Sequence, residues 1–242
     1  MPERINLAEH RESDMFDEHL SRYQFAVPYI KKKKVLDIGC GVGYGSYYLK
    51  KNEALSVAGI DKSEEAILFA RENYISFNLR YENLDFLKVK PSIYDILVMY
   101  EFIEHVLDPL EYLKHAIKFI NKKGLLILST PNIQNPTTYQ NDKKNEFHLS
   151  TKNKDELLEI LKNVGFGDIT VWYQEKKRRY LYERNSLGNI ILGVDKIYNN
   201  LMVTKIKKKL GIHDNIPWDS SLFIDSLPVS LDDWEFSLFQ SP

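Results

Sequence analysis

A glycine-rich segment directly after a short apolar run carries the clearest chemical signal in the chain. Residues 35–45 read Val-Leu-Asp-Ile-Gly-Cys-Gly-Val-Gly-Tyr-Gly, so an acidic residue, Asp37, precedes four glycines spaced two apart. Glycine tolerates positive φ angles and allows a ligand to approach the backbone closely. Open α/β sheets bind their ligands beyond the carboxyl ends of the strands. The segment therefore predicts a strand, a tight turn and a helix start, with a ligand lying against bare main chain.

The glycine spacing excludes two common nucleotide-binding patterns. The dinucleotide pattern G-x-G-x-x-G needs a glycine at its sixth position, which is Tyr44 when counted from Gly39 and Ser46 when counted from Gly41. A phosphate-binding P-loop needs Gly-Lys-Ser/Thr, and the chain has no such triplet. The pattern that remains, D-x-G-x-G-x-G, resembles the first motif of class I S-adenosylmethionine-dependent methyltransferases.

This resemblance implies where a cofactor would lie. In that family the glycines pass under the methionine part of S-adenosylmethionine, and the acidic residue, here Asp37, holds the methionine end. The residues that we expect around this part of the cofactor are Gly39, Cys40, Gly41 and Tyr44. A glycine turn without a ligand is the structural alternative.

A second acidic residue is spaced to bind a ribose. Asp61 lies 22 residues after Gly39, close to the spacing at which nucleotide-binding folds place a carboxylate on ribose hydroxyls. A carboxylate suits this role because it can accept hydrogen bonds from both hydroxyls. The alternative role of Asp61 is to cap the next helix, although Ser63 could do this instead. We expect Lys62 to line the same pocket.

Asp85 and Phe86 follow the third predicted strand. In methyltransferases that resemble this chain, an acidic residue here meets the adenine amino group, and the next residue packs against the adenine ring. The resemblance therefore implies these roles for Asp85 and Phe86. A turn carboxylate and a core aromatic residue are the alternatives.

Residues 100–105, Tyr-Glu-Phe-Ile-Glu-His, follow the fourth predicted strand, where the resemblance places the methyl donor. We expect Tyr100 to contact the cofactor and Glu101 and His105 to be catalytic. An unperturbed imidazole has a pKa of about 6.5, so His105 suits proton removal at neutral pH. Ubiquinone-pathway O-methyltransferases have a similar E-x-x-E-H pattern that is associated with a divalent cation, so Glu101, Glu104 and His105 are an alternative metal site. In a structural interpretation, Glu101 caps a short helix and His105 packs on the cofactor edge.

Two further segments resemble a subgroup of class I enzymes that modify cell-surface sugars or other small polar acceptors. They are Ser-Thr-Pro-Asn at 129–132 and Glu-Phe-His at 146–148, and residues 18–26 add to the likeness. The resemblance implies that Arg22 and Tyr23 touch the cofactor carboxylate. His148, on a loop near the expected acceptor mouth, is the second candidate for the general base, with a positioning role as its alternative.

The elements that must position these residues follow from alternating strand and helix patterns. Such alternation predicts an α/β fold with a doubly wound, mostly parallel sheet of seven strands, a Rossmann-like methyltransferase fold. We expect strands at 35–38, 55–60, 79–81, 95–99, 125–129 and 169–173, and a last, antiparallel strand at 233–239. We expect helices at 44–51, 64–74, 109–120 and 154–164.

The expected organisation has four parts. Residues 1–30 form an N-terminal helical cap whose helix ends at Pro28, and residues 31–174 form the cofactor-binding core. Residues 175–232 are an insertion in the terminal hairpin, with a helix near 190–209, that contacts the acceptor or a second subunit. Residues 233–242 hold the last strand and the C-terminus.

Composition and charge narrow the class of partner. The 242 residues include 33 basic and 34 acidic side chains, a net charge of −1, which leaves no electrostatic footprint of a nucleic-acid partner. The fourth-strand segment also lacks an N/D-P-P-Y tetrapeptide. One cysteine and no run of 18 apolar residues indicate a cytoplasmic protein without stable membrane insertion. The lysines at 31–34 form either a solvated strand entry or a phosphate-binding patch.

These patterns together predict an S-adenosylmethionine-dependent methyltransferase that modifies an oxygen of a small acceptor, such as a sugar or a nucleotide-sugar. The alternatives are an N-methyltransferase, a quinone or phenol O-methyltransferase, and a protein that binds S-adenosylmethionine without catalysis. A divalent cation is an open alternative as a second cofactor. The sequence leaves the oligomeric state open.

Overall fold

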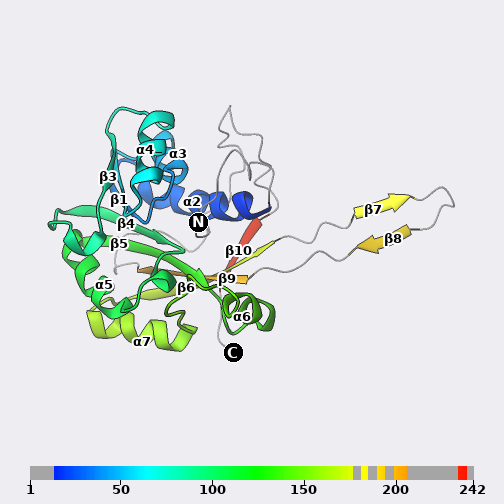
Figure 1. The fold of residues 1–242 in the computed structure, drawn as a ribbon. Coiled ribbons are helices and arrows are strands. Elements are labelled where there is room, and N and C mark those ends of the chain that lie inside the picture. Colours follow the sequence, from blue (N-terminus) through cyan, green and yellow to red (C-terminus); the bar gives the residue numbers. More distant parts are fainter. Residues whose placement is uncertain (1–13, 177–180, 185–189, 194–198, 206–233, 239–242) are drawn as a thin grey trace.

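An eight-stranded sheet forms the centre of the protein (Figure 1). The computed structural model describes residues 14–176, 181–184, 190–193, 199–205 and 234–238. Five parallel strands run side by side in the order β3 (Leu79–Asn83), β2 (Ser56–Asp61), β1 (Lys34–Ile38), β4 (Tyr94–Tyr100) and β5 (Ile120–Pro131). The strand order reverses between β1 and β4, which is the switch point where open α/β sheets bind ligands.

Three further strands extend the sheet beyond β5. These strands are β9 (Asn199–Lys205), β6 (Ile169–Lys176) and β10 (Trp234–Leu238). β9 is antiparallel to both of its neighbours, β5 and β6, and β10 is antiparallel to β6. Two more strands, β7 (Leu181–Arg184) and β8 (Ile190–Gly193), pair with each other in a separate two-stranded sheet.

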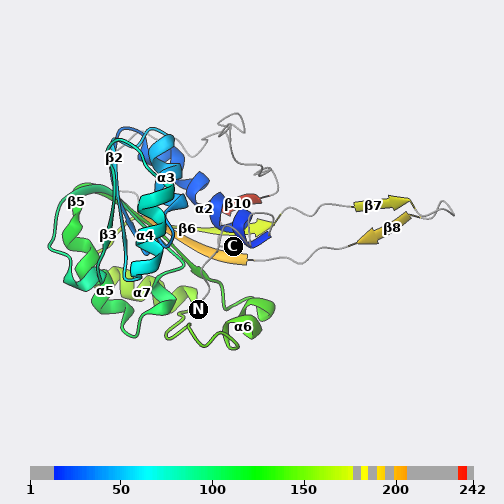
Figure 2. The ribbon, with the colours of Figure 1, turned by 45° about the horizontal axis from the view of Figure 1, so that its top comes forward.

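Helices cover both faces of the sheet (Figure 2). Alternate strand residues point to opposite faces. Val35 belongs to the apolar cluster that includes α2 (Asp14–Ile30) and α3 (Tyr44–Lys51), whereas Leu36 belongs to the cluster that includes α5 (Pro109–Ala116) and α7 (Lys154–Val164). The remaining described helices are α4 (Glu64–Asn73), α6 (Pro136–Asp142) and the short 3₁₀ turns η1 (Phe86–Lys88), η2 (Ile103–His105) and η3 (Ile117–Phe119). Among the described residues, no helix has the length and apolar character needed to cross a membrane.

The α/β fold is confirmed, but the strand count and one helix were predicted wrongly. The described sheet has eight strands instead of seven. Residues 190–193 and 199–205, inside the helix predicted near 190–209, are the strands β8 and β9. A short apolar run fits either a helix or a strand. Here β5 and β6 both pair with β9, and this pairing satisfies its backbone groups on two sides.

The last strand and the N-terminal helix were also predicted from the sequence. The last strand, β10, is antiparallel to β6 as predicted, and it lies at the sheet edge. The N-terminal helix continues through Pro28 to Ile30 rather than ending at the proline. Val27 and Ile30 are 3% and 0% exposed, so burial of this last turn favours its helical form despite the hydrogen bond that proline cannot donate.

Candidate functional site

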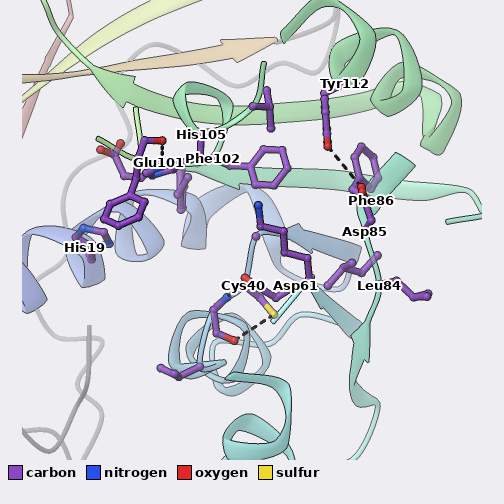
Figure 3. A pocket seen from close by; sticks show the side chains of 18 of the residues that line it. His19, Cys40, Asp61, Leu84, Asp85, Phe86, Glu101, Phe102, His105 and Tyr112 are labelled. Atoms are coloured by element: carbon purple, nitrogen blue, oxygen red, sulfur yellow. Dashed lines mark hydrogen bonds between the residues drawn. The ribbon is translucent and has the colours of Figure 1, made fainter. Parts of the chain in front are cut away.

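A cavity of about 310 Å³ opens at the carboxyl ends of β1, β2 and β4 (Figure 3). Most of the residues predicted from the sequence lie in its wall. They are Tyr23, Gly39, Cys40, Gly41, Tyr44, Asp61, Lys62, Asp85, Phe86, Tyr100, Glu101 and His105. The predicted residues outside the wall are Arg22, Asp37, Glu104 and His148.

The glycine loop leaves the main chain bare on the cavity side. Gly41 has a φ angle of +54°, and a Cβ placed on it would meet no atom within 4 Å. A Cβ on Gly45, in contrast, would collide with the ring of Tyr23. The glycines therefore serve two needs, which are ligand approach at Gly41 and close packing of α2 against α3 at Gly45.

Asp61 ties the glycine loop to the following strand and helix. Its Oδ2 accepts a hydrogen bond from Gly41 N (2.9 Å), and its Oδ1 accepts one from Ser63 N (2.8 Å). Ser63 is the cap of α4, because its hydroxyl accepts from Ala66 N (3.2 Å). Each carboxylate oxygen of Asp61 retains capacity to accept a further hydrogen bond, and the residue lines the cavity beside Lys62.

Asp85, Phe86 and Tyr112 lie together at one end of the cavity, on the right in Figure 3. Asp85 Oδ1 accepts hydrogen bonds from Leu87 N (3.0 Å) and from the Tyr112 hydroxyl (3.5 Å). The ring of Phe86 is 3% exposed and packs against His115, with the ring centroids 5.0 Å apart. Phe86 is therefore both a core aromatic residue and part of the cavity wall.

A buried carboxylate lies behind this wall. Asp37 is 1% exposed and accepts hydrogen bonds from Ser46 Oγ (2.6 Å) and the Tyr23 hydroxyl (3.3 Å). Burial raises the pKa of Asp37 to about 7, with a further rise from the nearby Asp61, although the two hydrogen bonds lower it. In the family that the chain resembles, the acidic residue often holds the methionine end through water; here Asp37 lies outside the wall and bonds to Tyr23, which lines the cavity, so its predicted contact would be indirect.

Three tyrosines form an aromatic part of the wall. The ring of Tyr23 packs edge-on against Tyr44 and Tyr100, with centroids 5.9 and 5.0 Å apart. Burial raises the pKa of all three hydroxyls, so they are neutral hydrogen-bond donors. Among the described residues, the buried Tyr100 hydroxyl has no hydrogen-bond partner, which costs free energy. Burial likewise raises the pKa of Cys40 and keeps its thiol neutral.

A buried arginine also lies behind the wall. Arg22 is 1% exposed, and its Nη2 donates to Glu18 Oε1 (2.5 Å). Its Nε lies 3.7 Å from Glu101 Oε1, and neither Nε nor Nη1 has a hydrogen-bond partner in the part of the chain that the structure describes. The predicted contact between Arg22 and the cofactor would therefore act through Glu101, which lines the cavity.

Glu101 adopts a backbone conformation that is unfavourable for a residue with a side chain. Its φ angle is +45°. Its amide donates to Ser129 O (3.2 Å), and its Oε1 accepts a hydrogen bond from Ser129 Oγ (2.6 Å). These bonds to β5 hold the carboxylate in the wall. The alternative role of Glu101 as a helix cap is not observed, because the cap of η2 is Phe102.

His105 lines the cavity beside Glu101 and Phe102 (Figure 3), and a second histidine, His148, packs against it. His105 Nδ1 lies 3.0 Å from Phe147 O. A carbonyl only accepts hydrogen bonds, so Nδ1 of His105 carries a proton in this contact. His148 Nδ1 lies 2.6 Å from Asp142 Oδ1, and its ring packs edge-on against His105 at 4.8 Å. The second predicted base is thus behind His105 rather than in the wall.

His19 of α2 also lines this end of the cavity, and the sequence analysis assigned it no role. Burial lowers its pKa well below the usual value, and the charges of Arg22 and His105 lower it further, so the imidazole is neutral. Its position one helical turn before Tyr23 could have placed it on the same face. The other wall residues without an assigned role were Val42, Ile60, Leu84, Phe102, Val106, Tyr112, Glu146, Phe147 and Leu149.

The structure rearranges the alternative metal site. Among the described residues, the group whose potential ligand atoms all lie within 4.8 Å consists of Glu104, His105 and His148, without Glu101. Glu104 is 1% exposed, and burial and the neighbouring Glu101 raise its pKa well above the usual value. Its buried Oε1 accepts no hydrogen bond from any described residue. Each histidine has an outer partner at Nδ1, as metal-binding histidines do, so the set fits a divalent cation.

Comparison with known proteins identifies the family. The family described as "Methyltransferase domain" matches residues 7–171, which is most of the chain. The chain therefore belongs to this family of methyltransferases.

Individual relatives agree with this assignment. A "Probable S-adenosylmethionine-dependent methyltransferase" of Mycobacterium tuberculosis is 30% identical over 160 residues, which are 66% of this chain and 58% of that protein. A "Ubiquinone biosynthesis O-methyltransferase" of Coxiella burnetii is 35% identical over 107 residues, 43% of this chain and 45% of that protein. A crystal structure of a SAM-dependent methyltransferase from Archaeoglobus fulgidus has the same fold, with a TM-score of 0.61, 22% identity, and coverage of 82% of this chain and 96% of the other.

We expect Asp37 to make stability depend on pH. Its folded pKa of about 7 exceeds the ordinary 3.8, so its stabilising contribution is fully present below pH 3.8 and is lost as the pH rises through 7. A pKa shift of about three units corresponds to a change of roughly 4 kcal/mol in the free energy of unfolding across this pH range. Asp37→Asn, which cannot ionise, should flatten the fall in unfolding free energy between these pH values, measured by urea denaturation. The exposed Glu65→Gln is the control, and an unchanged slope in Asp37→Asn would contradict this account.

Proposed function

We propose that the protein transfers a methyl group from S-adenosylmethionine to an oxygen of a small acceptor. The observation that carries this proposal is the cavity at the carboxyl ends of β1, β2 and β4, whose wall joins a bare glycine turn to the carboxylates of Asp61 and Asp85. Membership of the methyltransferase family and the name of the mycobacterial relative support the same donor. When bound, S-adenosylmethionine supplies an electrophilic methyl group on a sulfonium.

The cavity wall offers a partner for each part of this donor. Asp61 has acceptor capacity for the ribose hydroxyls, and Asp85 can accept from the adenine amino group beside the ring of Phe86. The Glu101 carboxylate can accept from the ammonium group, and the side chains of Tyr23, Tyr44 and Tyr100 line the same cavity. Buried polar atoms favour such partners because leaving them unpaired costs free energy.

Catalysis would depend mostly on orientation and on one proton acceptor. Correct positioning of reactants can contribute about 7–11 kcal/mol. We propose His105 as the general base, because it lines the cavity and the contact of its Nδ1 with Phe147 O fixes the orientation of its ring there. A general base contributes about 10²–10⁴ in rate. The neutral His19 is the second candidate in the wall, while His148 is placed to orient His105.

We infer that the acceptor presents a hydroxyl group, with sugars and nucleotide-sugars as the first class to test. The neutral His19, together with His105 and the carboxylate of Glu146, lines this end of the cavity, and these side chains can bind hydroxyls. Phe147 and Leu149 are 42% and 51% exposed beside them, a feature that favours a quinone or phenol acceptor as the alternative.

An acceptor panel tests this proposal. The formation of S-adenosylhomocysteine should be measured with sugars, nucleotide-sugars, phenols and amines. Turnover with hydroxyl acceptors is expected. Turnover with amines alone would show that the methylated atom is a nitrogen and would contradict the proposed oxygen acceptor. Cofactor binding without turnover on any acceptor would indicate a binding protein.

We expect Asp61→Ala to weaken S-adenosylmethionine binding about tenfold or more, because hydrogen bonds to a charged group are lost. Isothermal titration calorimetry measures the change. Asp95→Ala is the matched control, since Asp95 also accepts from a backbone amide, Lys34 N at 2.8 Å, but at the other end of the sheet. An affinity of Asp61→Ala equal to that of the control would remove the ribose assignment.

His105→Ala should lower kcat by about a hundredfold or more while the dissociation constant of S-adenosylmethionine stays near the wild-type value. The reason is that the side chain acts on the acceptor proton rather than on the donor. His115→Ala is the control, because His115 binds Val89 O outside the cavity wall. Wild-type kcat in His105→Ala would exclude this residue as the base.

A divalent cation at Glu104, His105 and His148 is a second hypothesis, favoured by the closeness of their ligand atoms. A bound cation would polarise the acceptor oxygen. Elemental analysis of the purified protein should then detect a metal that is lost in Glu104→Gln and retained in Glu101→Gln, since Glu101 lies outside the group. Full activity after complete removal of metal by a chelator would dismiss the hypothesis.

A further inference from the structure

The amino ends of the parallel strands form a second distinctive surface, on the side of the sheet away from the cavity. We call the surface of residues 31–34, 53–55, 75–78, 91–95 and 120–124 the amino-end face. β1, β2 and β4, which separate it from the cavity, are five, six and seven residues long, or roughly 17–23 Å. Substitutions on the amino-end face therefore leave the cavity wall untouched.

Hydrogen bonds join these loops into one continuous surface. Leu55 N donates to Lys33 O (2.9 Å). Asp95 Oδ2 accepts from Lys34 N (2.8 Å), and its Oδ1 accepts from Asn121 Nδ2 (2.7 Å). The loop at 75–78 joins the same surface because it leads into β3, which pairs with β2. Segments far apart in the sequence are thus held side by side.

The amino-end face is strongly basic. Its lysines are all exposed, and they are Lys31, Lys32, Lys33, Lys34, Lys122 and Lys123. The carboxylates within the same loops are Glu53 and Asp95. Glu53 pairs with Lys31 (3.7 Å), and both oxygens of Asp95 are hydrogen-bonded. This local excess of positive charge contrasts with the net charge of −1 of the whole chain.

Large apolar side chains stand exposed beside the lysines. Phe77 and Ile75 are 84% and 76% exposed, and Ile93 and Leu55 are 57% and 50% exposed. A single exposed apolar residue is ordinary, but a group of them on one surface indicates an interaction site. A combination of lysines and exposed apolar groups is typical of surfaces that bind the headgroup region of membranes.

We propose that the amino-end face binds peripherally to bilayers that contain anionic phospholipids. The lysines pair with lipid phosphates, and Phe77 and Ile75 enter the headgroup region, while the cavity faces the aqueous phase. Nucleic acid is a poorer fit, since these loops have no arginine and its phosphate backbone gains nothing from exposed aliphatic chains. A second copy of the same face is also a poorer fit, because like charges would meet.

Vesicle co-sedimentation of the full chain tests this proposal, which does not depend on the reaction proposed above. Binding should be strong to vesicles of phosphatidylcholine with phosphatidylglycerol, weak to phosphatidylcholine alone, and reduced by salt. Lys33→Glu with Lys122→Glu should lower the partition coefficient at least about tenfold. Lys143→Glu with Lys144→Glu, the same charge change on the turn after α6, should leave it near the wild-type value.

A second pair of variants tests the apolar part. Ile75→Ser with Phe77→Ser should also weaken vesicle binding and keep wild-type calorimetric binding of S-adenosylmethionine, since both residues are far from the cavity. Three results would overturn the proposal. The first is equal binding to neutral and anionic vesicles, and the second is an equal loss of vesicle binding in the two lysine double variants. The third is tighter binding to duplex DNA than to anionic vesicles at the same salt concentration.

Discussion

The hydrogen bonds of one carboxylate, Asp61, fix the geometry on which the cavity depends. Asp61 holds Gly41 N and Ser63 N at once, so the loop after β1 and the start of α4 cannot move independently. Bonds to an ionised acceptor are stronger than bonds between neutral groups. Gly41 is thereby held at a positive φ with open space on its cavity side. The residue proposed to bind the ribose thus also builds the surface on which the cofactor would rest.

The N-terminal helix completes the cavity and is anchored to the far half of the sheet. α2 contributes His19 and Tyr23 to the wall. Gln174 of β6 donates to Ser21 Oγ (2.6 Å) and Glu18 O (2.9 Å), across more than 150 residues of sequence. Strand β6, which lies beyond β5 and β9 in the sheet, therefore positions the helix that faces the acceptor, and the cofactor and acceptor ends of the cavity depend on different parts of the sheet.

Sequence patterns predicted those residues of the site whose position follows directly from the end of a strand. Asp61 ends its strand, and the glycine loop and Asp85 come within two residues after theirs, so strand prediction alone places them at one sheet edge. Side-chain direction was not predictable in the same way. The spacing of Glu101, Glu104 and His105 does not show that Glu101 turns to Ser129 on β5, whereas Glu104 turns toward His148. β9 was missed because its partners are distant in sequence and its apolar run fits two elements.

The left-handed backbone of Glu101 has a consequence for engineering. Glu101→Gly would relax the strain at φ +45°. A design of stabilised variants that considered only backbone conformation would therefore choose this substitution. The exchange would also delete the carboxylate that Ser129 holds beside Arg22. Loss of that carboxylate would leave the buried Arg22 with one negative neighbour fewer, so the gain from the relaxed backbone would be offset. The strained backbone at Glu101 is thus retained together with the carboxylate that it positions in the cavity wall.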